Sequence, residues 1–207
     1  MLHQLTCLFV RVAVLLAAAA APAHAHHAMD YALPATALEG LLSGLGHPVI
    51  GVDHLLFIAG AGVLAARFAR GILLPLAFVV ASVAVAGLRY LGVDLGLGEL
   101  WIAGSLVVLG ALMLAASVPG RGVTVGLFMI AGALHGYALA EAIVGAERTP
   151  LAAYLAGLAL VQSAIALGAW WVATWLALRR PRVPLQRLAG AVIGIAGVAF
   201  AGVAAFS

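Results

Sequence analysis

Apolar residues form six long runs along the chain, and polar residues stand mainly in the short gaps between them. The runs cover residues 41–66, 71–91, 99–118, 123–145, 150–178 and 186–206. Each run is near or above the roughly 20 residues that an α-helix needs to cross the hydrocarbon core of a bilayer. The pattern predicts an all-α, polytopic membrane protein, a bundle of six transmembrane helices with gaps too short for another domain.

The first residues have the pattern of a secretory signal. A basic residue precedes an apolar run, and Ala23-His24-Ala25 offers the small residues of a cleavage site. This pattern predicts a cleavable signal peptide over residues 1–25, followed by one six-helix transmembrane permease domain over residues 26–207. The alternative is an uncleaved first helix.

The composition agrees with a membrane protein. The chain is 66% hydrophobic and 8% charged, whereas soluble domains have about 25% charged residues. All basic residues are Arg, and they lie mainly in or beside the gaps between the runs. This distribution determines how the helices are oriented in the membrane and does not form a surface that binds nucleic acid. Without Lys there is no P-loop of the G-x-x-x-x-G-K-[ST] type. The single cysteine, Cys7, lies in the predicted signal peptide, so the mature protein has neither disulfides nor thiolate ligands.

The arginines predict the orientation of the helices. Seven lie in alternate gaps, which are Arg67, Arg70, Arg121, Arg179, Arg180, Arg182 and Arg187. Only Arg89 and Arg148 lie near the opposite ends of the runs. Since positive residues favour the cytoplasmic side, we expect a multi-pass protein of the bacterial cytoplasmic (inner) membrane with both termini outside.

Ionisable residues cluster at the head of the first run, where His47, Asp53 and His54 precede a long apolar stretch. Each such group costs about 2.5 to 3.5 kcal/mol inside a spanning helix, so three together predict a functional site. On a continuous helix, two residues seven apart such as His47 and His54 lie within about 20° of one another. Asp53 either orients an imidazole or joins the ligands through a helix distortion, for which Pro48 and Gly51 provide freedom.

A second polar pair, His135 and Glu141, lies in the fourth run, which has the opposite direction. At about 1.5 Å of rise per residue, we expect His54 and His135 to lie at roughly equal depth below the outer ends of their runs. Equal depth predicts one site that opens to the exterior and contains His47, Asp53, His54, His135 and Glu141. Imidazole with carboxylate and no thiol suits divalent Ni, Co, Zn, Mn or Fe and argues against Cu(I).

Some polar positions allow two interpretations. A lone buried histidine such as His135 is more often structural than a ligand. Gln162 and Ser163 in the fifth run, and Ser82 in the second, could hydrogen-bond between helices or line an inward path. A signal cut after Ala23 would place His26 third in the mature chain, where it and the terminal amine could chelate a divalent metal.

The motif H-P-x-x-G-x-D-H-L-L at residues 47–56, followed by H-G-Y-A-L-A-E at residues 135–141, resembles the HupE/UreJ proteins. The resemblance covers nearly the whole mature chain. It implies a secondary nickel or cobalt permease that serves hydrogenase or urease maturation. It also implies that His47, Asp53 and His54 form one metal motif, and that His135 and Glu141 form a second.

We therefore expect a permease, not an enzyme, that takes up a divalent transition metal, with nickel or cobalt as cargo and no prosthetic group. Its expected partners are the metal ion and the lipid bilayer, without nucleic acid, and a homo-oligomer is left open. Three alternatives are an intramembrane zinc-dependent hydrolase, an accessory protein of hydrogenase or urease metallocentre assembly, and a b-type haem protein. The haem protein would use His47 or His54 together with His135.

Overall fold

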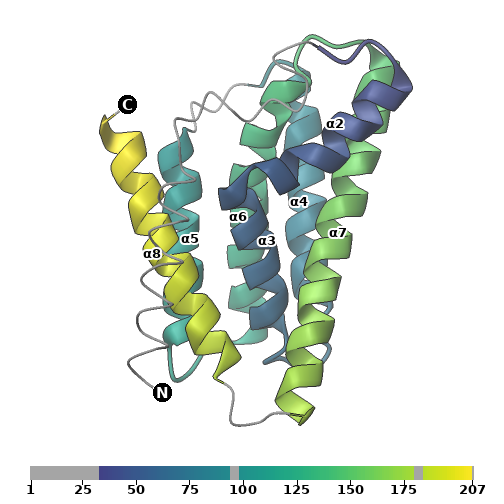
Figure 1. The fold of residues 1–207 in the computed structure, drawn as a ribbon. Coiled ribbons are helices and arrows are strands. Elements are labelled where there is room, and N and C mark those ends of the chain that lie inside the picture. The colour runs from purple at the N-terminus through teal and green to yellow at the C-terminus, as the bar shows by residue number, and fades with distance from the viewer. Residues whose placement is uncertain (1–32, 94–97, 180–183, 207) are drawn as a thin grey trace.

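The computed structural model describes residues 33–93, 98–179 and 184–206, and this part of the chain is helical without strands (Figure 1). The helices are α2 (Ala37–Ile50), α3 (Val52–Ala65), α4 (Leu73–Tyr90), α5 (Glu99–Leu114), α6 (Arg121–Leu139), the 3-10 turn η2 (Ala140–Ala142), α7 (Arg148–Arg179) and α8 (Leu185–Phe206). The all-helical class is confirmed. The predicted signal peptide and His26 lie outside the described residues.

Length and hydropathy support membrane-spanning helices but do not establish six of them. Four stretches of the described chain are long and apolar enough to cross a membrane, namely α4, α6 with η2, α7 and α8. A fifth is obtained if α2 and α3 are counted as one bent span. Helix α5 has 16 residues, which is about 24 Å at the usual rise. The described chain is therefore a membrane-type bundle with four or five spans by these criteria.

The helices alternate in direction, so α2 begins at the end of the bundle where α8 finishes (Figure 1). At the opposite end, α3 and α7 finish and α4, α6 and α8 begin (Figure 1). Most of the described arginines lie at these helix ends or in the loop between α3 and α4, and they are Arg67, Arg70, Arg121, Arg179 and Arg187. Arg89 and Arg148 lie near the first end. The alternation matches the predicted one, and which end faces the cytoplasm stays a prediction.

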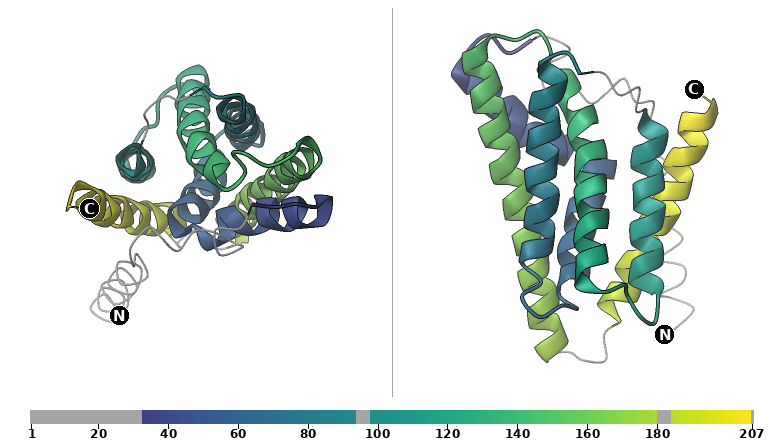
Figure 2. Two further views of the ribbon diagram at one scale, coloured as in Figure 1. Left: turned by 90° about the horizontal axis from the view of Figure 1, so that it is seen from above. Right: turned by 180° about the vertical axis from the view of Figure 1, so that it is seen from behind.

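Close helix packing depends on small residues. Helix α5 packs along α8, where a Cβ on Gly110 would lie 2.6 Å from the Cα of Gly194. Gly190 and Gly194 both lie against Gly110, so the two helices approach closely where they carry no side chains. Seen from above in Figure 2, α3 lies among the other helices, and it contacts α5, α7 and α8. Residues on α3 are therefore enclosed by the bundle.

The prediction of one continuous helix over residues 41–66 is wrong. The first run is broken at Gly51 into α2 and α3, which are bent by 78° relative to one another. Pro48 has no N–H and its ring crowds the carbonyl four residues earlier, which weakens the end of α2. Gly51 then adopts an extended conformation, with φ −71° and ψ 96°, and donates its N–H to the carbonyl of His47 at 3.0 Å. His47 and His54 consequently lie on two half-helices and not on one helical face.

Candidate metal site at the broken helix

Three imidazoles from three helices gather at this break. His47 comes from the end of α2, His54 from the first turn of α3 and His135 from α6, and their side chains are at most 6% exposed. The ring centroids of His47 and His54 are 6.1 Å apart, and those of His54 and His135 are 4.9 Å apart. The predicted proximity of His54 and His135 is confirmed. His47 lies beside His54 because the chain bends between them, and not because of helical periodicity.

The contact between His54 and His135 is a direct hydrogen bond. Their Nδ1 atoms are 2.7 Å apart, so one ring donates a proton and the other accepts it. The Nε2 atom of His135 lies 2.9 Å from Ser105 Oγ, whose own hydroxyl proton is donated to the carbonyl of Ile102 at 2.7 Å. Ser105 must then accept from His135 Nε2–H. A neutral His135 accordingly accepts at Nδ1, and His54 donates from Nδ1, a tautomer assigned from these partners.

The position of the ring proton of His47 follows from its hydrogen-bond partners in the same way. Its Nδ1 atom lies 3.2 Å from the hydroxyl of Tyr154, which donates its only proton to the carbonyl of Leu139. The tyrosine oxygen therefore accepts from His47 Nδ1–H. Tyr154 reaches this position because Gly44, one turn before His47, lets α2 approach the backbone of Tyr154 directly. The hydrogen bond thus depends on the absence of a side chain at Gly44.

When both rings are neutral, these hydrogen bonds place the ring proton on Nδ1 and make Nε2 the basic nitrogen of His47 and of His54. Metal-binding imidazoles have this arrangement, since the second ring nitrogen usually donates to an acceptor that fixes the tautomer and the ring orientation. Both nitrogens of His135 are already engaged, by His54 and Ser105. In this arrangement His135 positions His54, and its assignment as a metal ligand stays a prediction.

Asp53 supports the start of α3. Its Oδ1 atom accepts the backbone N–H of His54 at 2.8 Å. A carboxylate in the first turn is also favoured by the positive end of the helix dipole. Asp53 therefore holds the turn that carries His54, which agrees with the expected orienting role although it acts through the backbone. Its membership of a ligand set stays a prediction.

Glu141 is not brought to the imidazoles. Helix α6 ends at Leu139, before the predicted limit at residue 145, and Glu141 lies exposed on η2. Within the described ranges, no group of three or more His, Cys, Asp or Glu side chains is placed to hold a metal ion. The site is therefore centred on the imidazoles, and the membership of Glu141 in it stays a prediction.

An apolar layer lies beside the imidazoles, toward the arginine-rich end. It is formed by Phe57 of α3, Phe78 of α4 and Phe128 of α6, all at most 2% exposed. The ring centroid of Phe57 lies 4.7 Å from that of His135. The Phe57 ring also stacks on Phe78, with 5.0 Å between centroids, and meets Phe128 edge-on, with 6.3 Å between centroids. Phe57 lies nearer the arginine-rich end than His54 of the same helix. The same holds for Phe78 relative to Ser82 in α4, and for Phe128 relative to His135 in α6. The three rings therefore close the bundle beneath His135.

Gln162 and Ser82 form a separate buried pair. Both are fully buried, and Gln162 Nε2 donates to Ser82 Oγ at 3.1 Å, which joins α7 to α4. Gln162 Oε1 has no hydrogen-bond partner among the described residues, although such a buried acceptor typically costs about 1–3 kcal/mol. The expected hydrogen bond between helices is confirmed, and a role in an inward path stays a prediction.

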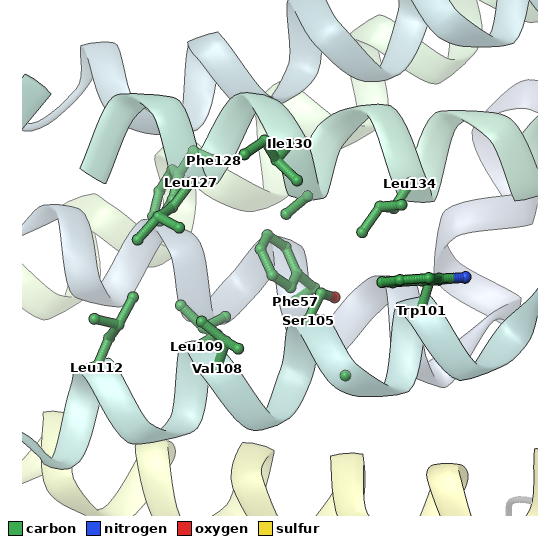
Figure 3. A pocket seen from close by; sticks show the side chains of 12 residues that line it. Phe57, Trp101, Ser105, Val108, Leu109, Leu112, Leu127, Phe128, Ile130 and Leu134 are labelled. Carbon is green, nitrogen blue, oxygen red and sulfur yellow. The ribbon is translucent and has the colours of Figure 1, made fainter. Parts of the chain in front are cut away.

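A pocket of about 300 Å³ opens between α5 and α6 (Figure 3). Its wall is mostly apolar, and Figure 3 shows Ser105 and Phe57 at its centre. None of the predicted metal residues is among its described lining residues. Ser105 connects the pocket to the imidazoles, because it lines the pocket and is also the hydrogen-bond partner of His135.

Two residues of the site were not predicted from the sequence, Ser105 and Tyr154. Each is an isolated hydroxyl inside an apolar run, and buried hydroxyls normally find a hydrogen-bond partner. That rule could have marked both as candidates. Their partners lie 30 and 107 residues away in sequence, so only the packing of the helices shows which groups they serve.

Comparison with known proteins assigns the chain to a family. A family model described as HupE / UreJ protein matches residues 12–200. No curated protein and no solved structure matches the chain. The matched region contains the broken helix, the second histidine motif and all three imidazoles of the site. The chain therefore belongs to the HupE/UreJ family.

Proposed function

We propose that the chain is a secondary permease that takes up a divalent transition-metal ion, nickel or cobalt, through His47 and His54. The HupE/UreJ family is generally linked to nickel or cobalt uptake or to metallocentre assembly. The observation that carries the proposal is the meeting of two imidazoles at a helix break, each with Nδ1–H held by a hydrogen bond. We propose that the ion binds at the basic Nε2 of each ring.

The break itself favours a transport site. In many secondary transporters, discontinuous helices place polar groups at the middle of the membrane, where substrates and ions bind. A dication there needs several ligands and compensating negative charge, because an isolated charge in a medium of low dielectric is very unfavourable. Asp53, beside His54 in the sequence, is the nearest source of such charge on α3. Borderline metals such as nickel and cobalt accept imidazole and carboxylate together.

The layer formed by Phe57, Phe78 and Phe128 closes the path from the imidazoles to the arginine-rich end, so the site is open to one side of the membrane at a time. An ion held at His47 and His54 has Phe57, Phe78 and Phe128 between it and the arginine-rich end. Apolar constrictions of this kind gate ion pathways, because a hydrated ion cannot pass until the rings move. We infer that the imidazoles are reached from the end where α2 begins, and that passage requires the aromatic rings to separate.

The distribution of arginines supports an orientation with the arginine-rich end in the cytoplasm of a bacterium and both termini outside. The membrane potential then drives uptake without an ATPase. At about 2.3 kcal/mol per charge per 100 mV, a dication gains about 4.6 kcal/mol, enough for roughly a thousandfold accumulation.

The proposal is tested by nickel and cobalt uptake into proteoliposomes with an imposed potential, negative inside. A permease should accumulate the ion above its external concentration and should lose the accumulation when the potential is collapsed. Protein-free liposomes are the control. A protein that binds nickel tightly but never carries it across the membrane would contradict the permease and favour a role in metallocentre assembly.

A further inference from the structure

The arginine-rich end of the bundle has no acidic residues among those that the structure describes. Its arginines lie at helix ends or in the loop between α3 and α4, and they are Arg67, Arg70, Arg121, Arg179 and Arg187. The sequence contains no Asp or Glu in residues 54–93, 100–140 or 148–207. The described residues of this end therefore supply no carboxylate to neutralise these guanidinium groups, which leaves them to anionic groups of surrounding molecules.

A pocket lies among these arginines. It has a volume of about 390 Å³ and is enclosed by the last turns of α3 and α7 and the first turn of α8. Its polar lining consists of Arg67, Gln186 and Arg187, while Val63 and Leu176 belong to its apolar wall. This volume is within the range of pockets that bind small molecules. The pocket is thus amphipathic, with its cationic groups next to apolar surface.

The charged groups of the pocket are hydrogen-bond donors, and Gln186 adds an amide N–H group to them. Arg67 donates from Nη1 and Nη2 to the carbonyls of Ala115 and Ala116, at 3.1 and 2.9 Å, which fixes its guanidinium group and leaves further N–H groups to donate elsewhere. Gln186 Nε2 is buried and has no hydrogen-bond partner in the described ranges. The first N–H groups of an α-helix such as α8 also lack intrahelical acceptors. Such a set fits an anion with several acceptor oxygens.

We propose that this pocket binds the phosphate group of an anionic phospholipid. The phosphate oxygens accept from Arg187, from Gln186 Nε2 and from the remaining N–H groups of Arg67. The apolar wall at Val63 and Leu176 fits the glycerol and the first methylenes of a lipid, which inorganic phosphate lacks. Basic pockets between membrane helices bind anionic headgroups in this way, and one arginine contributes about fivefold in affinity. The proposal is independent of the transported ion.

Native mass spectrometry of the full chain in detergent tests the proposal. The wild type should retain phosphatidylglycerol in preference to phosphatidylcholine with the same acyl chains. Arg187→Gln should lower the affinity for phosphatidylglycerol about fivefold, and adding Gln186→Leu should lower it further. Arg121→Gln is the matched control, because Arg121 lies at the same end but outside the pocket lining. Arg121→Gln should leave the affinity unchanged.

Three results would overturn the proposal. Equal retention of both lipids by the wild type would show that the pocket does not select an anionic headgroup. Equal losses in Arg187→Gln and Arg121→Gln would assign the attraction to the general charge of this end. Displacement of phosphatidylglycerol by an equimolar amount of inorganic phosphate would identify a phosphate site and exclude the lipid. Thermal unfolding of each variant in the same detergent confirms that only folded protein is compared.

Discussion

His54 and His135 are joined by a hydrogen bond of 2.7 Å between their Nδ1 atoms, so the imidazole at the start of α3 takes its orientation from an imidazole on α6. His135 is held in turn by Ser105 of α5. Three helices therefore determine the direction in which His54 presents Nε2. At a separation of 2.7 Å the two rings share a proton, and no space remains between them for a porphyrin. A haem held between His54 and His135 is incompatible with this arrangement.

The hydrogen bond predicts unequal effects for the two histidines. His54→Ala removes a ligand atom and should weaken nickel binding the most. His135→Ala keeps that atom but loses the group that orients it, which typically costs about 10- to 100-fold in metal affinity. Because His135 acts through His54, the double variant should bind nickel no more weakly than His54→Ala. Calorimetric titration of the three variants decides this, and losses that simply add would show two independent sites.

Tyr154→Phe should weaken both the fold and the site. The change removes the hydroxyl between His47 Nδ1 and the carbonyl of Leu139, and an unpaired buried group costs about 1–3 kcal/mol in the free energy of unfolding. Tyr90→Phe is the matched control, since its hydroxyl donates to the carbonyl of Ala146 at 2.9 Å, away from the imidazoles. It should lower stability without changing nickel affinity. Wild-type nickel affinity in folded Tyr154→Phe would disprove the role assigned to Tyr154.

Gly51→Ala should disturb His54 specifically. A Cβ at this position would lie 2.7 Å from Cδ2 of the His54 ring, so the ring has to move. We expect lower nickel affinity while the protein stays folded. Gly168→Ala in α7 is the control, because its Cβ would meet nothing within 4 Å and Ala is favoured over Gly in a helix by about 0.5–1 kcal/mol. Equal nickel binding by the two variants would show that the break tolerates a side chain.

The limits of α7 and α8 follow closely from hydropathy. The runs at residues 150–178 and 186–206 correspond to α7 and α8 within two residues, because polar residues at both ends limit each apolar stretch. The break in the first run could not be located in this way. Hydropathy contains no angular information, and the run stays apolar through Gly51. Pro48, which was expected to allow a helix distortion, lies inside α2, and the bend follows it.

The proximity of His54 and His135 was predictable because it depends only on helix direction and depth, two quantities that the sequence determines. The partners of the rings were not predictable in the same way. Ser105 and Tyr154 reach the imidazoles through the packing of α5 and α7, which depends on contacts between distant residues such as Gly44 and Tyr154. Glu141 was expected to share one apolar helix with His135, but α6 ends at Leu139 and Glu141 lies exposed on η2.

The orientation can be tested with single cysteines, since the only native cysteine, Cys7, lies in the predicted signal peptide. Gly98 and Gly120 precede α5 and α6 at opposite ends of the bundle, are exposed and have room for a side chain. In intact spheroplasts, a membrane-impermeant maleimide should label Gly98→Cys. It should label Gly120→Cys only after permeabilisation. The reverse pattern would place the arginine-rich end outside and contradict the proposed direction of uptake.

Radioactive nickel uptake tests the role of His54 most directly, with the wild type and His54→Ala reconstituted into proteoliposomes at equal density under one imposed potential. We expect accumulation by the wild type, and uptake by His54→Ala no greater than that of protein-free liposomes. Gly168→Ala should match the wild type, which controls for reconstitution. Accumulation by His54→Ala at the wild-type rate would disprove the proposed transport site, because the ion would then cross the membrane without the imidazole on which the site is centred.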